Sequence, residues 1–250
     1  MSDVRLYVDT PLTGGEEVSL DKGQSHYLSN VMRRSEGDTV LLFNGRDGEW
    51  RAGIAAAGKK EVRLSLEEQI RPQPDEPDLW LMFALLKRGP VDLIAEKATE
   101  LGATRLLPVI TDRTNSDRIN ADRLAAIARE ASEQCGRLSI PAIEEPRPLC
   151  QALDGWPDDR QIILMNETGA GKSIAEVMQA QAGTPGTILI GPEGGFSPEE
   201  LDALAKLDFV TSASMGRRLM RAETAAIAAL TVWQAVAGDW IEKGYNIRHG

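Results

Sequence analysis

The spacing of apolar and polar positions changes once along the chain, at a segment rich in proline. Before that segment, short stretches alternate or run apolar and are separated by turn residues such as Glu36-Gly-Asp38 and Asn44-Gly45. Short strands of this kind close most simply into a small β-barrel. The strands that we expect are Val4–Asp9, Thr39–Asn44, Glu49–Ala57 and Glu61–Glu67, with one helix at His26–Arg34.

Beyond the proline-rich segment, apolar stretches alternate with stretches of helical periodicity. The expected strands are Leu79–Leu86, Leu106–Ile110, Gln161–Met165, Thr187–Ile190 and Phe209–Met215. The expected helices are Val91–Leu101, Ala121–Arg137, Ser173–Gln181, Pro198–Leu207 and Ala222–Lys243. This alternation predicts a mostly parallel sheet with helices on both faces, which binds ligands beyond the carboxyl ends of its strands.

The proline-rich segment itself marks the expected domain boundary. Ile70–Asp78 contains three prolines among polar and charged residues, which is typical of a stiff, extended linker. We therefore expect one domain over residues 1–71, a linker over 72–78 and a second domain over 79–250.

Composition narrows the class of protein further. There is no apolar run long enough to span a membrane and no secretory leader at the start, so we expect a cytoplasmic protein. The two cysteines, Cys135 and Cys150, lack the close spacing of a disulfide framework or metal site. The two histidines, His26 and His249, are too far apart to suggest a metal cluster, and we expect no metal.

The net charge of −10 opposes a nucleic-acid partner, but the charge is uneven. Residues 1–74 carry −2 and the remainder −8. In the first part, Arg33 and Arg34 adjoin Tyr27, while Arg46 and Arg51 flank an expected hairpin that carries Trp50. These arginines either contact RNA phosphates or are solvated on a small barrel.

Two loops that follow expected strands carry the candidate chemistry. Gly191-Pro-Glu-Gly-Gly-Phe-Ser197 has three glycines that permit close backbone approach, and Ser197, Pro198 and Glu200 predict a capped helix start. Gly216-Arg-Arg-Leu-Met-Arg-Ala-Glu-Thr-Ala225 opens the last helix with three arginines, where the helix dipole disfavours cations. A tight turn and a solvated helix start are the plain alternatives.

Both loops resemble signatures of the RsmE family of 16S ribosomal RNA (uracil-N3) methyltransferases, which belong to the SPOUT superfamily. In the second signature, Met215 stands for Leu and Leu219-Met220 for Ile-Leu, substitutions that conserve volume and polarity. Further matches span nearly the whole chain: His26–Arg33, Leu42–Trp50, Lys97–Gly102, Glu130–Arg137 and a loop at Arg113-Thr-Asn115.

The resemblance implies an α/β fold in which a PUA-like β-barrel precedes a parallel-sheet methyltransferase domain with a trefoil knot. It implies homodimers and S-adenosyl-L-methionine (AdoMet) as cofactor, held largely by backbone groups of the two loops. A side chain at Gly195 is expected to occupy space that the cofactor needs. The cofactor-binding residues that it implies are Leu189, Ile190, Gly191, Glu193, Gly194, Gly195, Met215, Gly216, Leu219, Met220 and Ala225.

The implied partner is 16S ribosomal RNA or the small ribosomal subunit, contacted through Arg33, Arg34, Arg46 and Arg113. N3 of uridine is a poor nucleophile while it holds its proton, so a base or a cation must assist the transfer. We expect Arg221 to stabilise the developing negative charge and Glu223 to accept the proton or orient Arg221. A structural ion pair is the alternative for Glu223, and Glu167 is a further candidate on the same face.

Three other functions compete with this interpretation. Gly169-Ala-Gly-Lys-Ser173 approaches the phosphate-binding loop of nucleotide triphosphatases, but Asn166 stands where that motif requires glycine. The plain alternative there is a glycine-rich loop with Ser173 as a helix cap. A non-catalytic RNA-binding module and a related methyltransferase with a different RNA site are the other two.

The last helix is the expected dimer interface. Along Ala222–Lys243, the residues Ala225, Ala226, Ala229, Trp233, Val236 and Trp240 form an apolar stripe that is broad for a surface helix. The alternative is that this stripe only covers the sheet of its own chain.

Overall fold

The computed structural model describes residues 4–58, 61–114, 118–169 and 171–241, which form two compact units. The first unit comprises Met1–Asp75 together with Ser132–Ile140, and the second comprises Glu76–Ala131 and Pro141–Gly250. The first unit therefore includes a segment that lies far along the chain from the proline-rich stretch.

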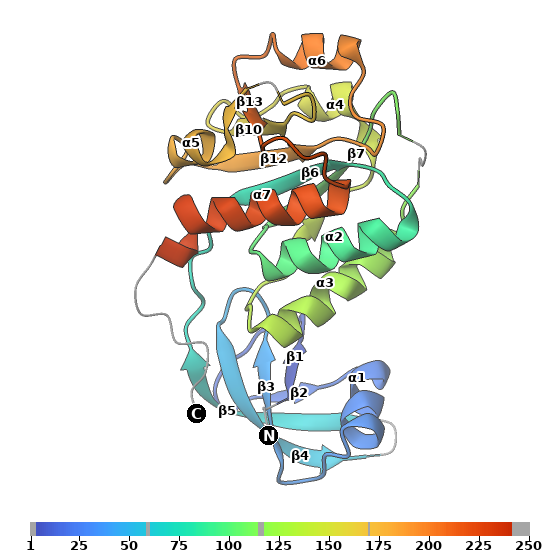
Figure 1. The fold of residues 1–250 in the computed structure, drawn as a ribbon. Coiled ribbons are helices and arrows are strands. Elements are labelled where there is room, and N and C mark those ends of the chain that lie inside the picture. The colour runs from blue at the N-terminus through green and yellow to red at the C-terminus, as the bar shows by residue number, and fades with distance from the viewer. Residues whose placement is uncertain (1–3, 59–60, 115–117, 170, 242–250) are drawn as a thin grey trace. The chain divides into compact units, whose positions relative to one another are not determined.

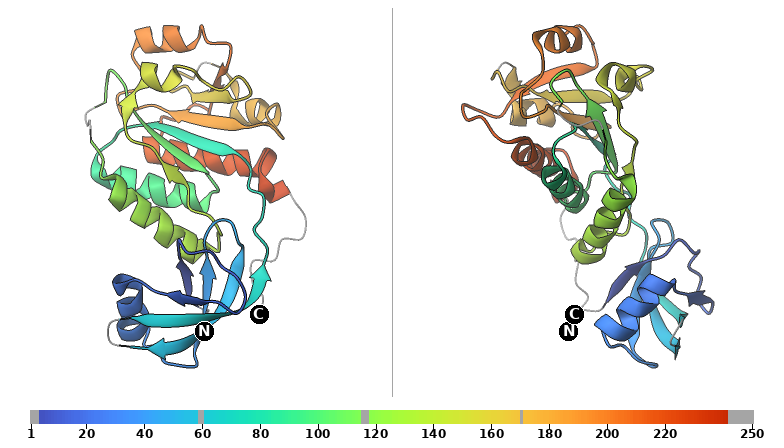
Figure 2. Two further views of the ribbon diagram at one scale, coloured as in Figure 1. Left: turned by 180° about the vertical axis from the view of Figure 1, so that it is seen from behind. Right: turned by 90° about the vertical axis from the view of Figure 1, so that its right-hand side faces the viewer.

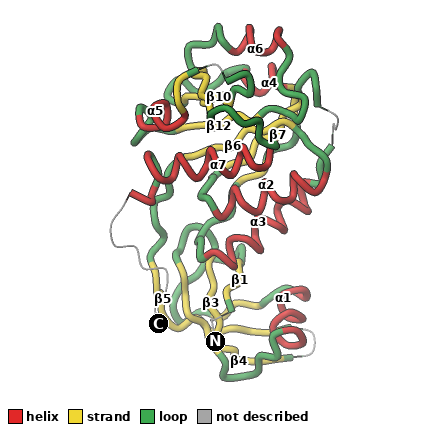
Figure 3. Tube along the Cα trace, viewed as in Figure 1, coloured by secondary structure: helices red, strands yellow, loops and turns green. Residues whose placement is uncertain are grey.

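The first unit is built on a five-stranded sheet in the order β1-β3-β4-β5-β2 (Figure 3). Its strands are β1 (Arg5–Tyr7), β2 (Glu17–Ser19), β3 (Thr39–Phe43), β4 (Glu49–Ala57) and β5 (Val62–Arg71). Only β1 and β3 pair in parallel; the other neighbours are antiparallel. Among the described strands no ladder joins β1 to β2, so backbone pairing does not close the expected barrel.

The helical segment of this unit starts earlier than the sequence predicts. It consists of α1 (Lys22–His26) and a π-helical turn, η1 (Tyr27–Val31), instead of one helix at His26–Arg34. Asp21 explains the earlier start, because its side chain accepts a hydrogen bond from the Gln24 backbone N–H and caps the helix. Arg33 lies beyond the helical turn, with a φ of 53°.

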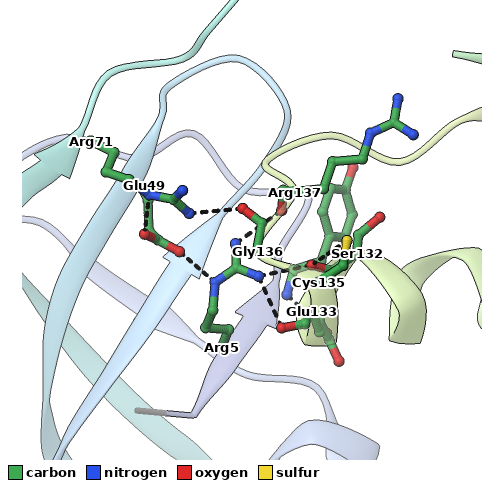
Figure 4. Close-up of polar contacts among 9 residues, drawn as sticks. Arg5, Glu49, Arg71, Ser132, Glu133, Cys135, Gly136 and Arg137 are labelled. Atoms are coloured by element: carbon green, nitrogen blue, oxygen red, sulfur yellow. Dashed lines mark hydrogen bonds and ion pairs between the residues drawn. The ribbon is translucent and has the colours of Figure 1, made fainter. Parts of the chain in front are cut away.

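The last turn of the long helix α3 (Ala121–Cys135) and the residues that follow it are held in the first unit by two arginines (Figure 4). Arg5 donates to the carbonyls of Ser132, Glu133 and Arg137, at 2.8–2.9 Å. Arg71 donates to the carbonyl of Gly136, at 2.9 Å. The buried carboxylate of Glu49 accepts from both arginines, at 2.5 and 2.7 Å, so one acid organises the cluster.

The second unit contains a larger sheet in the order β11-β13-β10-β12-β6-β7-β8, with β9 also paired to β7. Its strands are β6 (Leu79–Ala84), β7 (Arg105–Ile110), β8 (Ala142–Ile143), β9 (Arg147–Pro148), β10 (Gln161–Met165), β11 (Lys172–Ser173), β12 (Gly186–Ile190) and β13 (Val210–Ser214). Each of these pairs is parallel, as the strand–helix alternation predicts.

Helices cover both faces of this sheet (Figures 1 and 2). On one face α2 (Arg88–Glu100), α5 (Ile174–Gln179) and α7 (Ala222–Val236) pack against strand residues such as Leu81, Ile163 and Ile188. On the other, α4 (Leu149–Leu153) and α6 (Pro198–Leu204) pack against Leu164 and Leu189. Successive side chains of each strand point to opposite faces of the sheet, so the sheet has an apolar layer on each face.

The apolar stripe of α7 belongs to the core of its own unit. Ala225, Ala226, Ala229 and Trp233 are buried there, and Val236 packs against them. The stripe therefore covers its own sheet, and it gives no support to the predicted dimer interface. Trp240 lies outside this layer, 57% exposed, in the 3-10 turn η2 (Asp239–Ile241); residues 242–243 of the predicted helix lie outside the described residues.

Candidate active site

A cavity of about 330 Å³ lies where the neighbouring strands β10, β12 and β13 end. Because these strands are parallel, the loops that follow them meet at one edge of the sheet, where such folds bind ligands. Nine of the eleven predicted cofactor-binding residues line the cavity: Ile190, Gly191, Glu193, Gly195, Met215, Gly216, Leu219, Met220 and Ala225. Leu189 and Gly194 do not; Leu189 is fully buried in the sheet core.

The loop after β12 is shaped by contacts between its glycines and neighbouring side chains. Gly195 has a φ of 68°, and its N–H donates to the carbonyl of Pro192 at 2.9 Å. A Cβ at Gly191 would lie 2.7 Å from the ring of Phe196. A Cβ at Gly195 would collide with the carboxylate of Glu167. The space that a side chain at Gly195 would enter is thus occupied by Glu167.

Glu167 connects two of the loops that form the cavity. It follows β10, lines the cavity and accepts a hydrogen bond from the backbone N–H of Phe196 through Oε1, at 2.9 Å. One carboxylate oxygen therefore holds the loop after β12 against the loop after β10. This contact makes Glu167 a structural partner of Gly195 in the cavity wall.

The predicted start of α6 is confirmed in detail. Ser197 caps the helix, Pro198 occupies the first turn, and Ser197 and Glu200 form a reciprocal capping box. The Ser197 hydroxyl also donates to Asp112 at 2.7 Å, and Glu200 accepts from the Asp112 N–H at 2.9 Å. The cap thereby joins the loop after β7 to the loop after β12.

The loop after β13 places two arginines on the cavity. Gly216 has a φ of 93°, after which Arg218 and Arg221 line the cavity while Arg217 does not. Arg221 occupies the N-cap position of α7 without a side-chain cap hydrogen bond. Leu219, between them, is 81% exposed.

Glu223 is not brought to the cavity with Arg221. It lies half-buried in the first turn of α7 and is absent from the cavity lining. Within the described part of the chain, no hydrogen bond or ion pair joins its side chain to Arg221. The geometry therefore places Arg221, and not Glu223, at the rim of the cavity.

Several lining residues were not among the predicted cofactor-binding positions: Met165, Asn166, Pro192, Arg218 and Ala222, with Glu167 named only as a further candidate. Asn166 could have been found from sequence, because it follows a predicted strand at the carboxyl edge. Met165 and Ala222 gave no such signal, since apolar residues in a strand or helix are ordinarily core.

The segment that resembles a phosphate-binding loop has another structure. Lys172 and Ser173 form the edge strand β11 beside β13, and Ser173 caps α5 by accepting from the Glu176 N–H. Lys172 is exposed and does not line the cavity; Ala170 lies outside the described residues. The segment therefore does not have the structure of a phosphate-binding loop, which argues against the nucleotide triphosphatase hypothesis. The helix-cap interpretation of Ser173 is confirmed.

The predicted RNA-binding arginines lie on both units. In the first unit Arg33 is exposed, Arg34 is half-buried, and Arg46 donates to the carbonyl of Asp9 at 2.6 Å. In the second unit Arg113, which follows β7, donates to the carbonyl of Gly194 at 2.9 Å, so its side chain lies against the loop after β12. Asn115, which ends the loop matched at Arg113, lies outside the described residues.

Two features bear on membranes and metals. No helix in the described part of the chain is long and apolar enough to cross a membrane. A search of the same residues finds no group of three or more histidine, cysteine, aspartate or glutamate side chains that could hold a metal ion.

Comparison with known proteins assigns both units to families. The RNA methyltransferase domain family matches residues 73–234, and the RNA methyltransferase PUA domain family matches residues 20–67. Ribosomal RNA small subunit methyltransferase E of Rickettsia conorii is 33% identical over 228 residues, which cover 90% of this chain and 93% of that protein.

Solved structures share the fold over most of the chain. A putative methyltransferase from Legionella pneumophila, in complex with the bound cofactor SAM (AdoMet), has a TM-score of 0.86 at 29% identity and covers 96% of this chain and 100% of that one. Ribosomal RNA small subunit methyltransferase E from Neisseria gonorrhoeae, bound to S-adenosyl methionine, has a TM-score of 0.85 at 23% identity with the same coverage. With the family matches, these relatives place the chain in the ribosomal RNA small subunit methyltransferase E family, the AdoMet-dependent ribosomal RNA methyltransferases.

Proposed function

We propose that this enzyme methylates N3 of a uridine in 16S ribosomal RNA, with AdoMet bound in the cavity at the ends of β10, β12 and β13. The observation that carries the proposal is the meeting of the two signature loops around this one cavity, with Arg221 at its rim. Arg218 and Arg221 are the cations that line the cavity, and we assign contact with the base to Arg221.

The chemistry of the cavity suits AdoMet. Met165, Ile190, Met215 and Met220 offer apolar surface for a ring, and Glu193 adds a carboxylate that favours a cation. The volume falls within the range of small-molecule sites, roughly 300–1,000 Å³. When bound, AdoMet supplies an activated methyl group on a sulfonium.

The residues of the chain must then prepare the uridine. Its N3 edge is normally paired, so the base has to be unpaired or flipped out before it reaches the cavity. We assign to Arg221 the stabilisation of negative charge that develops as N3 loses its proton. Glu223 lies away from the cavity lining, and its role as proton acceptor stays a prediction.

RNA affinity is assigned mainly to the N-terminal domain. In this proposal residues 1–71 bind the RNA phosphates through Arg33, Arg34 and Arg46. Residues 72–78 link this domain to residues 79–250, which catalyse the reaction. Arg113, hydrogen-bonded to the loop after β12, would contact RNA near the cavity. The substrate is free 16S ribosomal RNA or the small subunit that contains it, in the cytoplasm.

Two properties implied by the family resemblance complete the proposal. The catalytic domain would contain the trefoil knot, and the enzyme would act as a homodimer. Because the stripe on α7 is buried in its own unit, other surfaces would form the interface. Sedimentation at micromolar concentration should give a dimer; a monomer would rule out this part.

The decisive experiment is to map methylation on 16S ribosomal RNA from a strain that lacks the gene. We expect one uridine to lose its N3-methyl group, and purified enzyme with AdoMet to restore it in vitro. Restoration at another nucleotide would indicate a methyltransferase with a different RNA site. RNA binding without any methyl transfer would indicate a non-catalytic RNA-binding module.

A further inference from the structure

The first unit contains a second cavity, of about 550 Å³, that the proposed reaction does not use. The helical segment from Lys22 to Ser35 forms most of its wall, and Ala57 and Gly58 at the end of β4 complete it. Its polar lining includes Lys22, His26, Ser29, Asn30 and Arg34. None of these five residues except Arg34 was predicted to contact RNA.

The electrostatic character of this cavity favours an anion. Its described lining residues include two permanent cations, Lys22 and Arg34, and no aspartate or glutamate. Among the described residues neither cation has an ion-pair partner, whereas Arg51 and Arg63 of the same unit pair with Glu68 and Glu17. In a protein of net charge −10, two unpaired cations at one hollow are notable.

Two carboxylates that adjoin the lining segment in the sequence are engaged with the backbone. Asp21 accepts from the N–H of Gln24 at 2.8 Å and caps α1. Asp38 accepts from the N–H of Ser35 at 2.9 Å. Neither carboxylate lines the cavity, so both leave its cations available to a ligand.

Uncharged polar side chains complete the lining. Ser25, Ser29, Asn30 and Ser35 line the cavity beside His26. The side-chain amide of Asn30 contacts the Nδ1 atom of His26 at 2.8 Å. The Oγ atom of Ser29 is shielded from solvent, so a ligand in the cavity would meet the other polar groups.

The backbone around these residues is unusual in two places. Tyr27–Val31 forms a π-helical turn, and Arg33 adopts a φ of 53°, which non-glycine residues seldom do. Both features cost free energy and occur often at functional sites. Here they arrange Ser29, Asn30 and Arg34 around the same cavity.

We propose that this cavity binds one nucleotide of the RNA substrate, with its phosphate between Lys22 and Arg34. The volume is large enough for a nucleotide. The inference rests on the proposed function, in which RNA is the substrate. It assigns RNA binding in the first unit to one defined cavity, whereas the proposed function named only separate arginines. A free nucleotide shares the same chemistry, so the test must separate the two sources.

The test uses the full chain and measures affinity by fluorescence anisotropy for a short single-stranded RNA and by calorimetry for uridine 5′-monophosphate. We expect Lys22→Ala combined with Arg34→Ala to weaken RNA binding about tenfold or more. The salt dependence should flatten by roughly 0.7 per lost phosphate contact on a log–log plot.

Matched controls isolate the site from general charge. Arg63→Ala removes a cation of the same unit that is paired with Glu17. Its effect on RNA affinity is compared with that of Lys22→Ala alone, because each variant removes one positive charge. Equal losses in these two single variants, or unchanged RNA binding in the double variant, would overturn the proposal. Loss of nucleotide binding with unchanged RNA binding would replace RNA by a free nucleotide as the ligand.

The result is independent of the proposed reaction. AdoMet affinity should stay at the wild-type value in each of these variants, because the cofactor cavity lies in the other unit. An enzyme that fails to methylate 16S ribosomal RNA could still bind RNA through this cavity, so the two failures are distinguishable.

Discussion

Glu167 and Gly195 constrain each other in the wall of the cavity at the ends of β10, β12 and β13. The carboxylate of Glu167 accepts from Phe196 N–H and occupies the place where a side chain at position 195 would begin. Gly195 in turn holds a φ of 68°, which glycine adopts readily. The glycine is therefore required for two reasons, backbone conformation and the carboxylate packed against it.

This pair predicts a coupled mutational effect. Gly195→Ala should weaken AdoMet binding by straining the backbone and displacing Glu167, and Glu167→Ala should weaken it by releasing the loop after β12. The double variant should lose less than the sum, by about 0.5–3 kcal/mol, because no carboxylate is left to displace. Calorimetry with AdoMet measures all three, and strict additivity would refute the contact.

Glu167→Gln serves as the control for this pair, because the amide oxygen can still accept from Phe196 N–H. We expect AdoMet affinity and turnover near the wild-type values. A large loss of turnover in Glu167→Gln with unchanged AdoMet affinity would instead make Glu167 the proton acceptor.

Arg221 should act on the reaction more than on cofactor binding. Arg221→Ala removes one of the two arginines that line the cavity, which we expect to lower kcat by about 10²–10³ while AdoMet affinity changes far less. Arg217→Ala is the matched control, since Arg217 is a neighbour that does not line the cavity. Equal losses in kcat and AdoMet affinity would show that Arg221 belongs to the cofactor site.

At the level of elements, the cap of α6 links helix stability to the cavity. Ser197→Ala removes the cap and the hydrogen bond to Asp112, and it should lower the free energy of unfolding by about 1 kcal/mol. Because the same cap anchors the loop after β12, AdoMet affinity should fall too. Urea denaturation and calorimetry measure the two effects.

Ser173→Ala provides the comparison, because Ser173 caps α5 without contacting that loop. It should reduce stability to a similar extent and leave AdoMet affinity unchanged. Unchanged AdoMet affinity in Ser197→Ala as well would mean that the cap does not position the cavity wall.

Long apolar strands could be located from sequence, whereas most strands of two or three residues could not; β1, inside the predicted Val4–Asp9, is the exception. The bounds of β4 and β10 match the predicted Glu49–Ala57 and Gln161–Met165 residue for residue. By contrast β2, β8, β9 and β11 have two or three residues each, too few for an alternating pattern to emerge. Such strands form because a neighbouring strand offers hydrogen bonds, which is a tertiary effect.

At the scale of the whole molecule, the first unit depends on a segment from beyond residue 130. Its turn at Ser132–Arg137 is bound by Arg5 and Arg71, whose charges are compensated by the buried Glu49. Removing one member of a buried ionic cluster leaves uncompensated charge in a poorly solvated place.

We therefore expect Glu49→Gln to destabilise this unit by about 3–5 kcal/mol, measured by urea denaturation. Glu17→Gln is the matched control, because it breaks an ion pair with Arg63 whose partners are both more than half exposed. That change should cost about 0–1 kcal/mol. Equal costs for the two variants would contradict the structural role assigned to Glu49.

The sequence by itself determined the periodicities, the two signature loops and the helix caps at Ser197 and Ser173. Each of these depends on residues that are neighbours in the chain, so local physical chemistry decides it. The signature loops also carried the family, because their residue order is specific over seven and ten positions.

Only the tertiary structure decided which residues meet. Glu167 and Gly195 are 28 positions apart, and Arg5 contacts a turn 127 and more positions away. The tertiary structure also assigned the apolar stripe of α7 to the core of its own unit. The sequence could not do so, because an apolar helix face has the same pattern whether it covers its own sheet or a partner subunit. Such contacts depend on how separate elements pack, and no local pattern encodes them.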